Sequence, residues 1–157
     1  MNDENFRKFI KDQTFISDEF LDGGYDFWFT DNEQQRSPFA KEIQEQLRKD
    51  SFRLFMEWVY ELTQEEKKEM KDEDLREMFE IILFNEGMKL AVSDEEKLTI
   101  TYPFMPRIGD MVNDEKMGKS KVKSRTIVKE DKNNMMMITL QTADGSAEWE
   151  TKFELPA

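Results

Sequence analysis

Apolar and polar side chains alternate along three consecutive stretches near the end of the chain: residues 119–129, 135–142 and 147–155. Side chains in a β-strand point alternately to the two faces of a sheet, so this period of two predicts strands with one buried face. The dipeptide Asp144-Gly145 between the last two stretches is typical of a tight hairpin. We therefore predict an antiparallel β-meander. In its second and third strands, the side chains expected to point toward the buried face are Met136, Ile138, Leu140, Trp149, Thr151, Phe153 and Leu155.

Basic side chains gather on the first of these strands, which a polar turn at residues 130–134 separates from the second. Strict alternation predicts one face with Val122, Ser124, Thr126 and Val128, and an opposite face with Lys119, Lys121, Lys123, Arg125 and Lys129. We call these last five residues the basic docking face, a candidate site for phosphate or an acidic partner. Two other interpretations stay open. The five cations can be balanced by Glu148, Glu150 and Glu154 on a nearby strand, or they can face the acidic helical region of the same chain.

The first two thirds of the chain show mainly the helical period. In residues 3–12, with Asn2 or Asp3 as cap, apolar residues recur at i, i+3 and i+4. Residues 37–91 carry broad apolar stripes and predict three or four helices that pack on the protein's own core. The expected boundaries are a start at Ser37-Pro38, a capping box at Thr63–Glu66, and a helix capped by Asp72 or Asp74. That last helix ends at Gly87 or is extended by a turn through residues 88–90.

An aromatic segment, residues 25–29, lies between the predicted helices and follows the turn signal Asp22-Gly23-Gly24. We interpret Tyr25 to Phe29 as a strand or loop that plugs the core, with a ligand site as the alternative. The acidic residues around it do not fit a calcium loop that starts at Asp18, because Phe20 and Phe29 occupy positions that require oxygen ligands.

Alternation and β-branching at residues 98–102 predict one more strand, which Pro103 and Pro106 end. The predicted fold class is therefore α+β, with an N-terminal helical region followed by a C-terminal antiparallel β-meander. We place the division between a mainly helical region, residues 1–97, and a β-module, residues 98–157.

The β-module resembles the SH3-like and Tudor-type small barrels over residues 106–156. The resemblance rests on Gly109-Asp110-x-Val112, Gly118, Val122 and the two strands around Asp144-Gly145. It implies a sheet that closes into an SH3-like small barrel and a docking module for peptides or nucleic acids. Some such barrels hold methylated lysine or arginine in an aromatic cage. No cage is carried over to this chain, because Trp149 and Phe153 fall on the inward face.

The amino-acid composition limits the catalytic groups and metal ligands that the chain can supply. The chain contains no Cys and no His, which excludes thiolate nucleophiles, the common serine triad and Cys or His metal ligands. Its six glycines form no phosphate-binding fingerprint. We therefore expect no cofactor, no metal and no catalytic residue. The longest apolar run, residues 81–84, is far shorter than the about 20 residues that span a bilayer. The N-terminus lacks the features of a signal peptide, so we expect a cytoplasmic protein without membrane partners.

The net charge of −12 is unevenly distributed. Residues 1–113 carry 15 Lys and Arg against 27 Asp and Glu, whereas residues 114–157 carry 8 of each. An acidic surface repels nucleic acid and anionic lipid. The leading prediction is a non-enzymatic protein-interaction or binding protein, with another protein as its partner. The alternative is a nucleic-acid-associated protein that uses residues 119–129, and the third candidate is a carboxylate-based hydrolase. The oligomeric state stays open.

Overall fold

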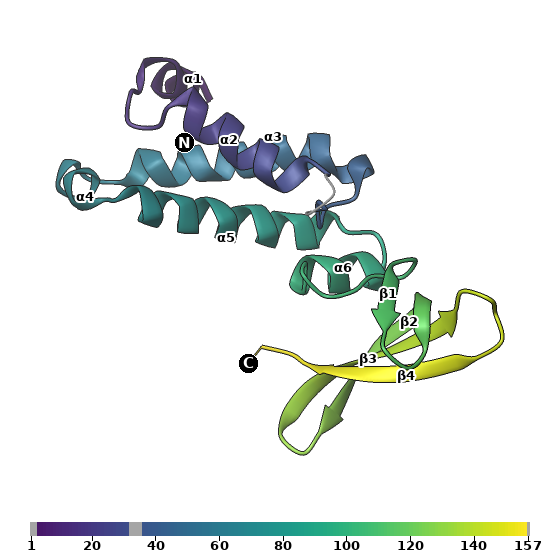
Figure 1. The fold of residues 1–157 in the computed structure, drawn as a ribbon. Helices are drawn as coiled ribbons and strands as arrows, with labels where there is room; N and C mark the ends of the chain where they lie inside the picture. The colour runs from purple at the N-terminus through teal and green to yellow at the C-terminus, as the bar shows by residue number, and fades with distance from the viewer. Residues whose placement is uncertain (1–2, 32–35, 157) are drawn as a thin grey trace. The chain divides into compact units, whose positions relative to one another are not determined.

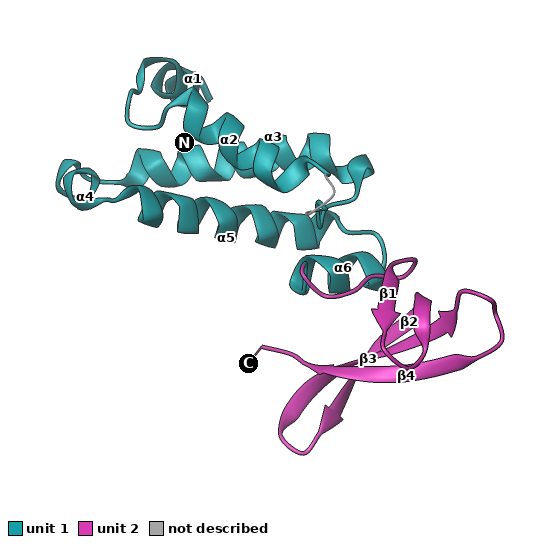
Figure 2. Cartoon of the chain, viewed as in Figure 1, with its two compact units in different colours: residues 1–103 teal, residues 104–157 magenta. Residues whose placement is uncertain are grey.

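The computed structural model describes residues 3–31 and 36–156, and it confirms the α+β class. Helices precede a single antiparallel sheet (Figure 1), and the chain divides into two compact units, residues 1–103 and 104–157 (Figure 2). The elements in chain order are α1 (Asp3–Asp12), α2 (Asp18–Phe29), α3 (Lys41–Glu61), α4 (Gln64–Glu69), α5 (Asp72–Leu90), α6 (Asp94–Thr101), β1 (Met111–Asp114), β2 (Gly118–Glu130), β3 (Asn133–Thr142) and β4 (Glu148–Glu154).

The helical unit is built on α3 and α5, which lie side by side and run in opposite directions (Figure 1). Aromatic rings fill much of the space between its helices, and the ring of Phe55 lies 5.7 Å from that of Phe79 at nearly a right angle. Gly87, an expected end of α5, lies inside that helix, and its missing side chain makes room for the Phe39 ring, because a Cβ there would come within 2.5 Å of the ring. The buried core consists of Ile16, Leu21, Tyr25, Trp28, Phe39, Ile43, Leu47, Phe55, Met56, Val59, Leu75, Phe79, Leu83 and Ile100.

The aromatic segment at residues 25–29 is helical, so its prediction as a strand or loop is wrong. It belongs to α2, whose first turn is capped by the Ser17 side chain accepting from the Phe20 backbone N–H at 3.1 Å. Within the helix, Leu21, Tyr25 and Trp28 recur at i, i+4 and i+7 and are buried together. The two glycines of the expected turn also lie in α2, and the one at position 24 allows the Phe79 ring to approach closely.

The predicted strand at residues 98–102 is also wrong, because Asp94–Thr101 forms α6. The Ser93 side chain accepts from the Glu96 backbone N–H at 3.1 Å and caps this helix. Thr99 and Thr101 donate their hydroxyl protons to backbone carbonyls four residues earlier, so the helix satisfies these β-branched residues. The boundary between the units accordingly falls after Pro103.

The other helix boundaries agree more closely with the sequence. The capping box at Thr63 and Glu66 is confirmed. Helix α5 begins at Asp72, but its cap position is Lys71 and not Asp72 or Asp74; the Asp74 carboxylate accepts from the Lys71 backbone N–H. The start at Ser37 is wrong by a few residues, since α3 begins at Lys41. The Ser37 hydroxyl donates to the Trp28 backbone carbonyl instead of capping the helix. The suggested cap Asn2 lies outside the described residues.

The four strands follow one another in the order β1-β2-β3-β4, so the meander is confirmed. Met136, Ile138 and Leu140 are buried as predicted, and β4 places Trp149, Thr151 and Phe153 opposite them on the same face. Gly145 has a φ of +73° in the hairpin between β3 and β4, and Asp131 has a φ of +53° in the turn between β2 and β3. Among the described residues, β1 and β4 are the two outer strands. Closure into a barrel stays a prediction.

Candidate interaction surface

The five residues of the basic docking face do not share one face of β2. The register against β3 shifts between Val122 and Ser124, which leaves Lys123 in a β-bulge. Before the bulge, Lys119 and Lys121 lie on the face opposite to buried Val122. After it the alternation is inverted, and Arg125 lies opposite Ile138 on the inner face.

Arg125 is a structural residue of the sheet unit. Its side chain is buried, with 8% of the residue exposed, and its Nη1 donates to the Pro106 backbone carbonyl at 2.8 Å. The bond ties the segment before β1 to the middle of β2. Lys129, opposite Asn134, also lies on the inner side after the bulge, but it is exposed. The basic docking face therefore reduces to Lys119 and Lys121 on the outer face and separate cations elsewhere.

The outer face of the sheet combines both signs of charge. Lys121 lies opposite Gln141 on β3, which in turn lies opposite Glu148 on β4. Two strand spacings separate the Lys121 and Glu148 backbones, about 10 Å. Charges at this separation attract one another weakly across solvent. Of the three glutamates of β4, only Glu148 lies across β3 from a lysine, because Glu150 and Glu154 lie in line with Ser124 and Val128 of β2. The geometry therefore supports balance of the basic strand at one position only.

Strand β4 is an edge of the sheet and presents free backbone groups. The Thr142 N–H donates to the Ala147 carbonyl, and the Leu155 N–H donates to the Asn134 carbonyl. Hydrogen-bonded and non-hydrogen-bonded pairs alternate in an antiparallel ladder. Residues 149, 151 and 153 therefore direct their N–H and C=O groups toward β3. The N–H and C=O groups of Glu148, Glu150, Lys152 and Glu154 point away from the sheet, where the described residues provide no further strand.

Two contacts hold β4 in place. The Trp149 Nε1–H donates to the Ser120 hydroxyl at 2.9 Å, and Ser120 is completely buried on β2. On the outer face, the Lys152 ammonium pairs with the Glu130 carboxylate at the end of β2. Phe153 is less covered, with 37% of the residue exposed. These side-chain contacts tie the edge strand to β2, while its outward-pointing backbone groups and part of its side chains face solvent.

The loops next to the strands are held by carboxylates. Asp144 in the β3–β4 hairpin accepts from the Ser146 hydroxyl, the Ser146 backbone N–H and the Thr142 hydroxyl, and these bonds lower its pKa to about 2. Asp114 at the end of β1 accepts the backbone N–H groups of Met117 and Lys116, which lowers its pKa below the ordinary value. Both carboxylates therefore stabilise tight turns.

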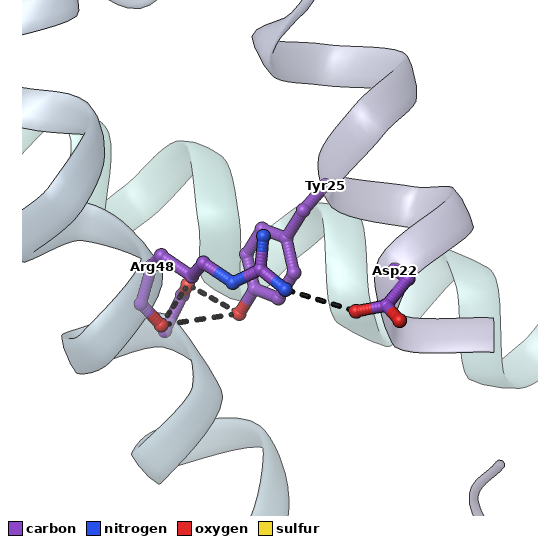
Figure 3. A network of polar contacts seen from close by, with 4 residues as sticks. Asp22, Tyr25 and Arg48 are labelled. Carbon is purple, nitrogen blue, oxygen red and sulfur yellow. Dashed lines mark hydrogen bonds and ion pairs between the residues drawn. The ribbon is translucent and has the colours of Figure 1, made fainter. Parts of the chain in front are cut away.

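In the helical unit, Tyr25 is the centre of a polar network that joins α2 to α3 (Figure 3). Its hydroxyl lies 2.8 Å from the Ser51 hydroxyl, and the Arg48 guanidinium lies 4.6 Å above its ring. Arg48 also pairs with Asp22 at 2.9 Å. Burial raises the Tyr25 pKa, while the hydrogen bond with Ser51 and the charge of Arg48 lower it in part. Tyr25 and Ser51 lie in the core, as expected for the aromatic segment, whereas Arg48 and Asp22 are exposed.

An open groove of about 560 Å³ lies between α1 with the loop after it and α4. The Lys67 ammonium lies over two rings there, 5.9 Å from the centre of Phe9 and 5.6 Å from that of Phe15. Asp12 is the one carboxylate in its lining. Glycoside hydrolysis by two carboxylates needs both acids around the scissile bond, so this groove does not supply that arrangement.

Within residues 3–31 and 36–156, no group of three or more His, Cys, Asp or Glu side chains is placed to hold a metal ion. None of the helices described there combines the length and the apolar character that crossing a bilayer requires.

The free backbone of β4 was not anticipated from the sequence, although the signal was present. The last strand of a meander has a neighbour on one side only, unless the sheet closes. The alternation at residues 147–155 already identified that last strand. Comparison of the chain with protein-family models, with characterised proteins and with solved structures finds no match.

Proposed function

We propose that this chain is a non-enzymatic protein-interaction protein, and that its sheet unit pairs the edge strand β4 with an extended segment of another polypeptide. The supporting observation is the row of outward-pointing backbone groups on Glu148, Glu150, Lys152 and Glu154. Addition of a strand to such an edge is a common mode of peptide recognition, in which main-chain hydrogen bonds supply the affinity. The resemblance of residues 106–156 to SH3-like and Tudor-type docking modules supports the same class of function.

The side chains of β4 supply selectivity for such a partner. Glu148, Glu150, Lys152 and Glu154 are exposed on the outer face, and Trp149 and Phe153 lie on the inner face. Charged side chains on an edge strand oppose indiscriminate pairing between sheets. A segment that matches these charges and also offers apolar residues at alternate positions is favoured, because unlike charges stabilise directly opposed cross-strand pairs.

The nucleic-acid alternative receives less support. The inverted alternation of β2 separates Arg125 from Lys119 and Lys121, so a continuous basic stripe is not formed. Phosphate binding by a few exposed lysines would weaken steeply with salt. A cytoplasmic location remains a prediction of the sequence.

A proline substitution tests the proposed edge pairing. Lys152→Pro removes an N–H that points away from β3, so the internal ladder remains intact while the edge loses a donor and gains a bulky ring. Lys152→Ala is the matched control, since it removes the same side chain and keeps the N–H. Partners are captured from an extract of the source cells, identified by mass spectrometry and purified for titration.

We expect a partner that binds the parent chain and Lys152→Ala, and binds Lys152→Pro at least about tenfold more weakly, which corresponds to about 1.4 kcal/mol. Equal affinity of the proline and alanine variants for the purified partner would contradict pairing through the β4 backbone. Loss of binding in both variants would instead assign recognition to the Lys152 side chain.

A further inference from the structure

We propose that the segment that pairs with β4 is β4 of a second copy of the same chain, so that two sheets join into one across a two-fold axis at Thr151. This inference rests on the proposed function of β4 as a pairing edge, and it names the partner. Closed two-fold symmetry is the commonest arrangement of homo-oligomers, and its interface must be self-complementary. The sequence Glu148–Glu154 meets that requirement in one register.

The backbone allows this register. When two antiparallel β4 strands are centred on Thr151, residues whose numbers add up to 302 lie opposite each other. Glu150 then faces Lys152 of the partner subunit, and both residues have N–H and C=O groups that point outward from their own sheets. They form hydrogen-bonded pairs, while Thr151 and Thr151 of the partner subunit form the central non-hydrogen-bonded pair. The alternation of the ladder is therefore satisfied along the whole strand.

The outer-face side chains are complementary at the centre of this register. Glu150 lies opposite Lys152 of the partner subunit, and the symmetry repeats this pair once more. Directly opposed unlike charges stabilise antiparallel strands. Glu148 meets Glu154 of the partner subunit only at the two ends, where both side chains are exposed and solvent screens their repulsion.

The inner-face side chains are complementary as well. Trp149 lies opposite Phe153 of the partner subunit in a non-hydrogen-bonded pair, where the backbones approach most closely. Aromatic pairs are among the stabilising cross-strand combinations. The row of Val122, Leu140 and Trp149 in one sheet then continues into Phe153 of the partner subunit. This pairing covers the Phe153 side chain, which is otherwise partly exposed to solvent.

Neighbouring registers are less favourable. A shift by two residues in one direction keeps two unlike pairs, Glu148 with Lys152 of the partner subunit, but it places Glu150 opposite Glu150 of the partner subunit at the centre and shortens the overlap to residues 148–152. A shift in the other direction places Lys152 opposite Lys152 of the partner subunit and shortens the overlap to residues 150–154. A further shift in the second direction pairs Lys152 with Glu154 of the partner subunit but leaves only three residues of β4 in the overlap. The register at Thr151 is thus the longest one that opposes unlike charges at its centre.

The test is the association state of the full chain, measured by sedimentation velocity over a concentration series. A contact between two short strands is small, so we expect reversible association, about micromolar or weaker. Glu150→Lys and Lys152→Glu each turn the two central pairs from attraction into repulsion. Each variant is expected to raise the dissociation constant about tenfold, because two opposed pairs change from attraction to repulsion at once.

Rescue makes the experiment specific for the register. The double variant Glu150→Lys/Lys152→Glu restores two unlike pairs and is expected to associate like the parent chain. An equimolar mixture of the two single variants is expected to form heterodimers, because the E150K copy then presents lysine at both central positions and the K152E copy presents glutamate at both. Glu150→Lys is the cleaner single variant, since Lys152→Glu also removes the ion pair with Glu130. Rescue in the mixture shows that neither single variant has failed to fold.

Three results would overturn the inference: a parent chain that stays monomeric at every concentration, association that both single variants leave unchanged, or failure of the double variant and of the mixture to associate. Amide exchange of Glu150 and Lys152 separates this inference from the proposed function. Protection that appears only with a captured partner overturns self-pairing and leaves the edge as a binding site. Absence of protection, both alone at high concentration and with a captured partner, overturns both.

Discussion

The two units differ in charge and in how they use their apolar side chains. Residues 1–103 carry 26 Asp and Glu against 14 Lys and Arg and so hold the whole net charge of −12, while residues 104–157 carry nine of each. The helical unit encloses a continuous cluster of buried aromatic and aliphatic residues. The sheet unit buries fewer, chiefly Val122, Met136, Ile138, Leu140 and Leu155, and leaves an edge strand open.

This difference assigns separate roles to the units. An unbalanced acidic surface keeps a protein soluble and repels other acidic chains at a distance. A neutral unit with unlike charges on one face can approach another polypeptide without that repulsion, and its short-range contacts then decide the outcome. We therefore expect core substitutions to act mainly on the helical unit and edge substitutions to act on association.

The largest expected effect is that of Phe55→Ala in the helical core. Phe55 is fully buried, and its ring contacts those of Phe20, Trp58 and Phe79. Truncation of such a residue leaves a cavity and is expected to lower the free energy of unfolding by about 3–5 kcal/mol. Phe104→Ala is the matched control, because this phenylalanine is 80% exposed and its truncation should change stability by no more than about 0.5 kcal/mol.

Amide exchange read separately for peptides of α5 and β3 makes Phe55→Ala a test of the comparison between the units. If the units differ as described, Phe55→Ala reduces protection in α5 and leaves β3 as it was. An equal loss in both peptides would show that the two units unfold as one cooperative body, and the separation of roles would fail.

Arg125→Met probes the sheet unit and is expected to have a smaller effect. Methionine retains the aliphatic volume but leaves the Pro106 carbonyl without the guanidinium donor, at a cost of about 1–3 kcal/mol. Lys121→Met is the control on the same strand, since Lys121 is exposed. Urea denaturation of both variants measures the difference. A strand that served only as a uniform basic stripe would respond alike to the two substitutions.

Elements whose periodicity agrees with their packing could be predicted from the sequence. The alternation at residues 135–142 and 147–155 gave the correct inward residues because these two strands pair without a register shift. On β2, the same reasoning failed after Val122. A bulge inserts one residue and inverts every later position, and no proline or glycine at residues 119–129 marks it. For this reason the residues of the basic docking face do not share one face of β2.

Two short segments were assigned to strands because their composition favours that conformation. Tyr25, Phe27 and Phe29 alternate, yet in the helix it is Tyr25 and Trp28 that are buried together. All three residues at 99–101 are β-branched, which favours a strand, but they form a helix, α6, that the Ser93 side chain caps. Local propensity is a weak signal over five residues, and tertiary packing with a single capping serine outweighed it in both segments.

Tyr25→Phe is expected to destabilise the helical unit by about 0.5–1.5 kcal/mol, since it deletes the hydroxyl that contacts Ser51. The substitution should also change how the free energy of unfolding falls at alkaline pH. Burial raises the Tyr25 pKa, so its neutral form stabilises the fold fully below the unfolded value of about 10, and that contribution is lost as pH rises through the folded pKa. The decline should be shallower in Tyr25→Phe and unchanged in Tyr60→Phe, whose hydroxyl is on an exposed residue.

The smallest expected effect concerns the hairpin that precedes β4. Asp144 accepts three hydrogen bonds, which lower its pKa to about 2, whereas the pKa of an ordinary aspartate is about 3.9. Because the folded pKa is depressed, the contribution of the carboxylate is present above the ordinary value and is lost as pH falls through about 2. Carboxyl chemical shifts followed by NMR should show this titration, and Ser146→Ala, which removes the hydroxyl donor, should move it upward. An ordinary titration of Asp144 in the parent chain would mean that the carboxylate does not hold the turn. The side-chain contacts that support β4 would then begin at Trp149.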